Sequence, residues 1–301
     1  MPSWQSYIIH PILRFSVKRK LARVSTPQAA RDAMPAPPPP PPGASYEADV
    51  VAGVPGEWVT SGIAVGTLLY LHGGGYFSCS PATHRSITAG FAQRGLKTFA
   101  VDYRLAPEHP FPAGLDDALA VYRGLLGQGV VPDQLVVGGD SAGGGLALGL
   151  LLAIKQAGLP MPCCAVLFSP WTDLAVTGAS VLTNSRRESM LVSGKLGLVA
   201  AGYLDGADPR DPLASPLYGD LAGLPPLLIQ VGEPEALRDD SVRLAERAEA
   251  AGVRVDLSVW DNMPHVWQLN TVFLPEARQA MDAAVAFAKT QLALALSPAA
   301  V

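Results

Sequence analysis

Cysteine and charged residues are scarce in this chain of 301 residues. The three cysteines, Cys79, Cys163 and Cys164, are odd in number and two are adjacent, so neither a disulfide framework nor a metal site is expected. A reducing, cytoplasmic setting fits them best. Charged residues make up 16% of the sequence and the formal net charge is −4. Nucleic acid is therefore not an expected partner, because phosphate binding needs clustered Lys and Arg.

Long apolar runs are missing as well. No stretch reaches the roughly 18 consecutive apolar residues of a membrane-spanning helix, so stable membrane insertion is not expected. Near the N-terminus, apolar residues precede the basic cluster Lys18, Arg19 and Lys20, which is the reverse of the order in a secretory signal. This start is predicted to be a helix packed on the body of the protein. Attachment to a membrane surface is the alternative.

The hydrophobic residues, nearly half of the chain, form short β-rich runs that alternate with helical segments. This alternation predicts an α/β fold, with a largely parallel sheet covered by helices on both faces. Strands are expected near 46–51, 57–60, 67–71, 97–101, 135–138, 164–168, 227–231 and 254–259. Helices are expected near 84–94, 114–126, 143–157, 239–251 and 275–293.

Two stretches depart from this alternation. Residues 1–45 are expected to form N-terminal helices, with a second helix start at Ser25-Thr26-Pro27, and then an extended linker, because Pro35 and the run Pro37 to Pro42 fit neither helix nor central strand. Residues 46–301 form the predicted catalytic domain. An insertion at about 173–212, helical around 193–204, is expected to cover the sheet as a lid together with the N-terminal helices.

The segment 135–145 has the pattern of a buried strand, a turn of small residues and an apolar helix. It contains Gly139-Asp140-Ser141-Ala142-Gly143, in which the glycines allow the sharp strand-to-helix turn that exposes a serine hydroxyl. The alternatives are a chance match and a phosphate-binding turn. No competing Gly-x-x-x-x-Gly-Lys-Ser/Thr pattern occurs, and no Gly-x-Gly-x-x-Gly is followed by the required acid. Ser141 is the predicted nucleophile.

A second glycine turn, Gly73-Gly74-Gly75, follows an upstream strand. Attack on an ester carbonyl creates an oxyanion, and each backbone N–H group aimed at it stabilises the transition state by roughly 3 kcal/mol. Gly73, Gly74 and Ala142 are the predicted donors. The adjacent His72 is expected to shape the loop through hydrogen bonds rather than to transfer protons.

Three segments resemble the hormone-sensitive-lipase-like branch of the α/β-hydrolase superfamily, the bacterial family IV esterases. They are His72-Gly-Gly-Gly-Tyr76, Asp102-Tyr-Arg-Leu-Ala-Pro-Glu-His109 with Pro110-Phe-Pro112, and Gly139-Asp-Ser-Ala-Gly-Gly144. The resemblance covers about residues 46–292. It implies an eight-stranded core, a helical cap built from the N-terminus and an insertion after the sixth strand, and hydrolysis of short-chain esters without a cofactor.

The base and the acid are predicted from chain order. His265 lies after the last predicted strand and before the final helix, where the Ser–acid–His order of this fold puts the base. The family commonly has Asp as its acid, ahead of a Leu and a second Asp. Aligning Leu237 and Asp239 with that pattern puts Glu235 in the acid's place, with Glu233 as the alternative. Asp239 and Asp240 are expected to begin the following helix.

The predicted function is that of a carboxylesterase acting on short-chain acyl esters through a Ser141–His265–Glu235 triad. Amide or carbohydrate-acetate hydrolysis on the same site and a non-catalytic small-molecule receptor of the same fold are the alternatives. A homodimer is also expected from the resemblance and from an exposed last strand or final helix. The segments Asp102-Tyr103-Arg104 and Asp116-Asp117 are expected to form structural ion pairs that brace the oxyanion loop rather than to contact substrate. Candidate pocket residues are Tyr76, Phe77, Trp171, Leu191, Tyr203, Val266 and Trp267.

Overall fold

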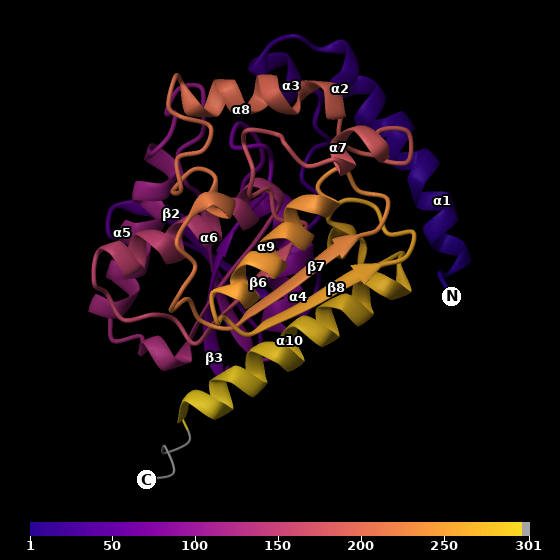
Figure 1. The fold of residues 1–301 in the computed structure, drawn as a ribbon. Helices are drawn as coiled ribbons and strands as arrows, with labels where there is room; N and C mark the ends of the chain where they lie inside the picture. Colours follow the sequence, from indigo (N-terminus) through magenta and orange to yellow (C-terminus); the bar gives the residue numbers. More distant parts are fainter. Residues whose placement is uncertain (297–301) are drawn as a thin grey trace.

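The computed structural model describes residues 1–296 and contains an eight-stranded sheet in the order β1-β2-β4-β3-β5-β6-β7-β8 (Figure 1). The pairs β1·β2 and β2·β4 are antiparallel, and every pair from β4 to β8 is parallel. The α/β fold with eight strands is therefore confirmed. The strands are β1 (Ser45–Val51), β2 (Val54–Thr60), β3 (Gly66–Leu71), β4 (Leu96–Val101), β5 (Leu135–Asp140), β6 (Cys164–Phe168), β7 (Leu227–Gly232) and β8 (Val255–Trp260).

Helices cover both faces of the sheet and its carboxyl edge (Figure 1). The longer ones are α1 (Trp4–Leu13), α3 (Pro27–Ala33), α4 (Arg85–Ala92), α5 (Ala113–Gly127), α6 (Ser141–Gln156), α8 (Leu196–Leu204), α9 (Arg238–Ala250) and α10 (Pro275–Leu296). The short ones are the π-helix η1 (Arg14–Lys18), α2 (Arg19–Arg23), α7 (Ser180–Thr183) and the 3-10 turns η2 (Pro81–His84), η3 (Pro132–Gln134), η4 (Ser193–Lys195), η5 (Pro216–Tyr218) and η6 (Trp267–Asn270).

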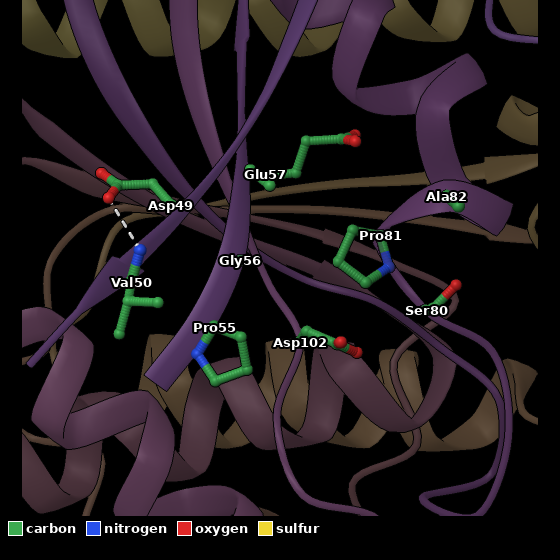
Figure 2. Close-up of a pocket in the computed structure, with 10 residues that line it drawn as sticks. Asp49, Val50, Pro55, Gly56, Glu57, Ser80, Pro81, Ala82 and Asp102 are labelled. Atoms are coloured by element: carbon green, nitrogen blue, oxygen red, sulfur yellow. Dashed lines mark hydrogen bonds between the residues drawn. The ribbon is translucent and has the colours of Figure 1, made fainter. Parts of the chain in front are cut away.

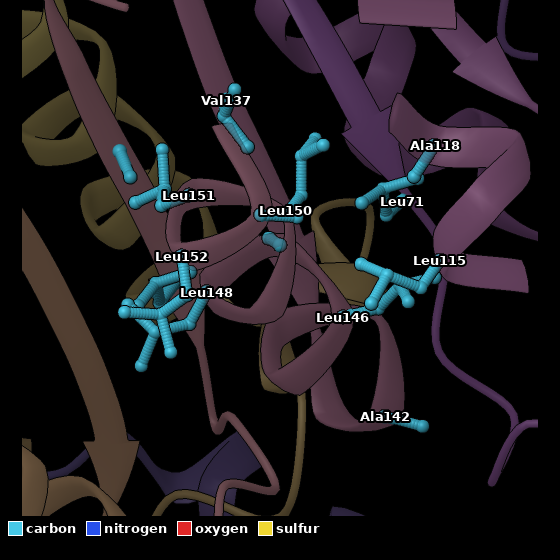
Figure 3. Packing of buried hydrophobic residues seen from close by; sticks show 14 of the residues in the cluster. Leu71, Leu115, Ala118, Val137, Ala142, Leu146, Leu148, Leu150, Leu151 and Leu152 are labelled. Atoms are coloured by element: carbon cyan, nitrogen blue, oxygen red, sulfur yellow. The ribbon is translucent and has the colours of Figure 1, made fainter. Parts of the chain in front are cut away.

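The two sheet faces bury alternate residues of the same strands. In β3, Leu69 and Leu71 pack in the cluster formed with α5, α6 and α9, whereas Leu68 and Tyr70 pack in the cluster formed with α4 and α10. Because both faces are covered, the central strands are mostly apolar, as expected for a buried parallel sheet, and the polar Gln230 in β7 is buried as well. Figure 3 shows the leucines of α6 packed among residues of β3, β5 and α5.

A cap, defined here as residues 1–34 and 180–204, lies over the carboxyl ends of the strands. Figure 1 shows α2, α3 and α8 above the sheet and α1 on the outer flank. The predicted second helix start is present, because Thr26 Oγ1 accepts the N–H of Ala29 and Pro27 occupies the first turn of α3. The π-helix η1 and the short helix α7 were not predicted from the sequence.

Two lysine side chains join the two parts of the cap by donating hydrogen bonds to backbone carbonyls. Lys195 Nζ donates to the carbonyls of Leu21, Ala22 and Val24 at 2.5–3.0 Å, at the end of α2. Lys18 Nζ donates in the opposite direction, to the carbonyls of Ser185 and Glu188. Since each ammonium satisfies helix-end or loop carbonyls, the N-terminal segment and the insertion form one layer.

Candidate active site

Ser141 lies at the tight turn between β5 and α6, with a left-handed φ of 53°. Only glycine fits beside it at Gly143, because a Cβ there would lie 2.1 Å from the carbonyl oxygen of Leu71 and 2.3 Å from that of His72. A Cβ at Gly139 would lie 2.3 Å from the carbonyl oxygen of Gly143. The turn therefore needs both glycines, and it holds the serine in a strained conformation typical of functional sites.

His265 connects the serine to a buried carboxylate. Its Nε2 lies 2.8 Å from Ser141 Oγ, and its Nδ1 lies 2.7 Å from Glu235 Oε2. Ser141, Glu235 and His265 are all buried and come from the turns after β5, β7 and β8. The geometry thus brings together a hydroxyl, an imidazole and a carboxylate that are up to 124 residues apart in the sequence.

Glu235 is held rigidly, and Glu233 is directed elsewhere. The second oxygen of Glu235, Oε1, accepts the Ser169 hydroxyl at 2.8 Å and the Gly232 N–H at 2.5 Å. The half-exposed Glu233 is ion-paired with Arg187 instead. Of the two acids considered from the sequence, the structure therefore places Glu235 against the imidazole.

The carboxylate of Glu235 raises the basicity of the imidazole. Burial has the largest single effect on the His265 pKa and lowers it, but the hydrogen bond and charge of Glu235 act in the opposite direction. The charges of Glu188 and Asp140 add to this effect, and the net pKa of His265 lies above its ordinary value of 6.5. His265 can therefore accept a proton from Ser141 more readily than an isolated imidazole.

The structure corrects the predicted role of Gly73. The N–H of Gly73 donates to Asp140 Oδ1 at 3.1 Å, so this amide is occupied and is not free to bind an oxyanion. Asp140 also accepts the Tyr70 hydroxyl at 2.6 Å, and its Oδ2 lies 3.2 Å from His84 Nε2. Gly74 and Gly75, with positive φ angles of 120° and 64°, line the cavity that contains Ser141. The sequence alone could not show which glycine amides Asp140 occupies.

His72 and Tyr103 brace the glycine loop. His72 Nδ1 lies 2.7 Å from the Gly73 carbonyl oxygen, and the imidazole ring stacks on Tyr103 with centroids 4.5 Å apart. The Tyr103 hydroxyl donates to the His72 carbonyl at 2.7 Å. Next to it, Arg104 forms the expected ion pair with Asp117 at 2.8 Å, whereas Asp102 and Asp116 form none within residues 1–296. These contacts agree with the shaping role predicted for His72.

A cavity of about 980 Å³ opens above Ser141 and His265. Five predicted pocket residues line it, namely Phe77, Trp171, Leu191, Tyr203 and Val266. Tyr76 and Trp267 do not. The ring of Tyr76 is buried beneath Tyr203, with stacked centroids 3.8 Å apart, and Trp267 packs in a core cluster with Ile9 and Met263. Both predictions were wrong because a position near a strand end does not tell on which side of the backbone a ring lies.

Much of the cavity wall was missed in the sequence. It comes from the N-terminal segment, through Val17, Leu21, Val24, Ala30 and Met34, and from α8. The spacing of Val17, Leu21 and Val24 is that of one face of a helix, so this signal was present. It could not reveal that the face covers a cavity rather than a solid core.

A second hollow, of about 400 Å³, lies near the antiparallel end of the sheet and contains none of the triad residues. Figure 2 shows Asp49, Glu57 and Asp102 around it with their carboxylates turned apart. Glu57 is already paired with Arg85. Within residues 1–296 no group of three or more His, Cys, Asp or Glu side chains is arranged to hold a metal ion.

The known proteins that are similar to this chain are hydrolases. A family model described as an alpha/beta hydrolase fold matches residues 68–269. An acetyl-hydrolase of Streptomyces hygroscopicus is 49% identical over 236 residues, which cover 78% of this chain and 79% of that protein. An esterase of Acinetobacter venetianus is 40% identical over 241 residues, 79% of this chain and 80% of its own.

Solved structures match over almost the whole chain. EstE5, in a crystal soaked with p-nitrophenyl butyrate, superimposes with a TM-score of 0.92 at 40% identity and covers 97% of this chain and 99% of its own. An esterase from the bacterial hormone-sensitive lipase family gives a TM-score of 0.90 at 41% identity, with the same coverage. This chain therefore belongs to the α/β hydrolase fold family, in its hormone-sensitive-lipase branch.

Proposed function

We propose that this protein is a carboxylesterase that hydrolyses short-chain acyl esters through an acyl-enzyme on Ser141. The observation that carries the proposal is the unbroken line of hydrogen bonds from Glu235 through His265 to Ser141, at 2.7 and 2.8 Å, below an apolar cavity. A hydroxyl is a weak nucleophile until a positioned base takes its proton. The relatives named esterase and acetyl-hydrolase support the same chemistry.

Each residue has one task in the proposed reaction. His265 Nε2 takes the proton of Ser141 Oγ as the oxygen attacks the ester carbonyl, and Glu235 holds the imidazolium that forms. The N–H groups of Gly74, Gly75 and Ala142 receive the oxyanion, with Gly75 replacing Gly73 in the donor set. His265 then returns the proton to the leaving alcohol. Water enters, and the same steps in reverse order release the acid and restore Ser141.

The substrate class follows from the site and from one relative. The walls of the cavity are mainly apolar, with few charged groups near Ser141, which suits an uncharged acyl chain better than a sugar. EstE5, whose crystals were soaked with p-nitrophenyl butyrate, has the same overall fold. Short aliphatic acyl esters are therefore the proposed substrates, ahead of amides and carbohydrate acetates.

Hydrolysis of p-nitrophenyl acetate through decanoate by the wild type, Ser141→Ala and His265→Ala tests the proposal. The wild type should release nitrophenol fastest with the shorter chains, and each variant should lose about 10⁴-fold or more in kcat. Circular dichroism checks that the variants fold. Near-normal rates in Ser141→Ala would refute the nucleophile, and a folded wild type inert on every ester would favour a non-catalytic receptor.

A cytoplasmic location and a homodimer are also proposed. Cys79, Cys163 and Cys164 are free thiols, which suits a reducing compartment. At the end of the sheet, β8 pairs with β7 alone among the strands of residues 1–296, and Val259 on it is exposed. Cell fractionation and sedimentation velocity test these two statements, and a periplasmic protein or a monomer at micromolar concentration would contradict them.

A further inference from the structure

The outer face of the N-terminal helices is apolar and uncovered. Trp4, Tyr7, Ile8, Ile12 and Phe15 recur at helical spacing over α1 and η1, and Trp4 and Phe15 are 65% and 70% exposed. On the opposite side of α1, the residues Ser6, Ile9 and His10 are buried against the body, so the predicted packing of this helix is confirmed. Amphipathic helices normally direct their apolar stripe inwards, and this segment has a second stripe facing out.

The exposed stripe continues onto a neighbouring loop. Val272 is 96% exposed, and the Phe273 ring meets Trp4 edge to face with centroids 6.2 Å apart. Within residues 1–296, eight of the seventeen exposed large hydrophobic side chains belong to this patch or to the adjoining Met1. We call the five helical residues with Val272 and Phe273 the outer patch. Contiguous apolar surface of this kind marks an interaction site.

Basic residues extend the outer patch along α2. Arg19, Lys20 and Arg23 are exposed, and the Arg19 guanidinium lies 5.5 Å from the centre of the Phe15 ring. In the part of the chain that the structure describes, none of the three forms an ion pair. The first 31 residues contain six Lys and Arg and no acid, whereas the rest of the chain has 16 Lys and Arg against 26 Asp and Glu.

We propose that the outer patch and the adjoining cations dock this protein on the surface of an anionic lipid bilayer. Tryptophan, tyrosine and phenylalanine rings settle at the headgroup level, and Lys and Arg attract anionic headgroups. None of the helices described in residues 1–296 is both long and apolar enough to span a membrane, so the contact is superficial. A second copy of the chain is disfavoured as the occupant, because a self-complementary interface would bring like charges together.

The outer patch and its cations lie on the same N-terminal segment that lines part of the cavity above Ser141. Val17, Leu21 and Val24, on the other side of the same segment, line the cavity above Ser141. Phe15 and the basic residues of α2 thus lie across one helix from the cavity, whereas α1 contributes none of its lining residues. Esters that partition into lipid would meet the enzyme near the cavity wall at this end of the docking surface. This last step depends on the proposed esterase activity, whereas the docking itself does not.

Vesicle co-sedimentation of the full chain tests the docking directly. Vesicles of phosphatidylcholine alone are compared with vesicles containing one quarter phosphatidylglycerol, at 0.1 M salt. The protein should sediment with the anionic vesicles and remain in solution with the neutral ones. It should dissociate from the anionic vesicles as salt is raised, because added salt shortens the screening length below its value of about 10 Å at 0.1 M and weakens the attraction to the surface. The measurement needs no turnover, so a failure of the esterase proposal leaves it unaffected.

Two variants separate the charged and apolar parts of the surface. R19Q/K20Q/R23Q should weaken the partition coefficient by roughly a hundredfold, about fivefold for each basic residue near an anionic leaflet. W4Q/F15Q should weaken it by at least about tenfold. The matched control R123Q/R247Q/R254Q removes three exposed arginines elsewhere and should bind as the wild type does.

Several results would overturn the proposal. They are equal binding to both kinds of vesicle, absence of binding to either, and unchanged binding in both patch variants that circular dichroism shows to be folded. Sedimentation velocity can give a further result that contradicts the proposal. A dimer that dissociates in W4Q/F15Q, with no vesicle binding by the wild type, would assign the outer patch to a second copy of the chain.

Discussion

Gly143 connects the two turns on which the proposed chemistry depends. Its Cα faces the carbonyl oxygens of Leu71 and His72, so the nucleophile turn lies directly against the entrance to the glycine loop. With a hydrogen in place of a methyl group at Gly143, the nucleophile turn can lie against the end of β3, where the glycine loop begins. Spacing of this kind decides how well an oxyanion is held, because hydrogen-bond strength falls steeply with distance and angle.

Gly143→Ala should therefore damage both stability and catalysis. The added methyl would lie 2.1 Å from the carbonyl oxygen of Leu71, so the two turns must separate. We expect a loss of about 3 kcal/mol in unfolding free energy and at least a hundredfold in kcat, measured by urea denaturation and ester hydrolysis. Gly197→Ala, in α8 with open space around its Cα, is the control and should be neutral or stabilising. A fully active Gly143→Ala would contradict the close fit.

Glu235 and Glu233 offer a matched pair of acids two residues apart. Glu235→Gln should lower kcat by about 10⁴-fold, because an amide cannot stabilise the imidazolium and favours the wrong tautomer of His265. Glu233→Gln breaks only a half-exposed ion pair with Arg187 and should leave kcat within about twofold of the wild type. The same ester assay measures both variants. Comparable losses in the two would show that the acid is misassigned.

The loop that carries Glu235 is anchored by the cap. Asn184, just after α7, donates to the carbonyls of Glu233 and Glu235 at 3.0 and 2.9 Å. The buried Glu188 accepts the N–H of Ala236 at 2.9 Å and also the N–H groups of Met190 and Leu191. The insertion thus does more than cover the cavity. It fixes the backbone on either side of the carboxylate that orients His265.

Glu188→Gln should alter the pH profile in a defined direction. The wild-type pKa of His265 lies above 6.5, so kcat/KM should fall as pH decreases through that raised value, when imidazolium can no longer accept a proton. Removing the Glu188 charge lowers the pKa of His265 and moves this acid limb to lower pH. Both carboxylate oxygens of Glu188 accept backbone N–H groups, so replacing one of them by an amide NH₂ should also lower the free energy of unfolding by about 1–3 kcal/mol. Glu233→Gln again serves as control, and an acid limb that stays in place or moves upwards would rule out the electrostatic role.

The elements that were predicted well from the sequence are strands buried on both faces and a turn that requires glycine. β5 and β6 are buried on both faces, so their continuous apolar runs identify them, and the turn at Ser141 follows from its two glycines. Gly73 was assigned wrongly because its amide is taken by Asp140, 67 residues away, and this pairing leaves no periodic signal. Glu235 was found only through the family resemblance. Local patterns predict elements well, whereas a site built from distant loops depends on tertiary contacts.

The cap and the sheet differ in how they are stabilised. In residues 1–34 only Ile9 and Ala30 are buried hydrophobic residues, and most ties to the rest of the molecule are hydrogen bonds from Lys, Arg and His side chains. The sheet rests on large apolar clusters on both faces. Stability is therefore unevenly distributed, with the N-terminal part of the cap, residues 1–34, held least firmly.

Hydrogen exchange followed by mass spectrometry should reveal this difference. Amides in α1 and α3 should exchange through a partial opening several kcal/mol below the global unfolding free energy, whereas those of β3, β5 and β6 should exchange only on global unfolding. A covalent organophosphonate on Ser141 that fills the cavity should slow exchange in α1 and α3 and leave the strands unchanged. Equal protection of cap and core in the free protein would contradict the uneven distribution.

The contacts of the N-terminal segment also set an order of events during synthesis. Ser3 hydrogen-bonds through its N–H and its hydroxyl to the carboxylate of Glu276, and His10 to the carbonyl of Asn262, across sequence separations of more than 250 residues. Residues 3–10 can therefore dock only after residues 262–276 have been synthesised. The N-terminal wall of the cavity can settle only when this docking has occurred, so a chain that ends before residue 262 carries Ser141 without a fully enclosed pocket.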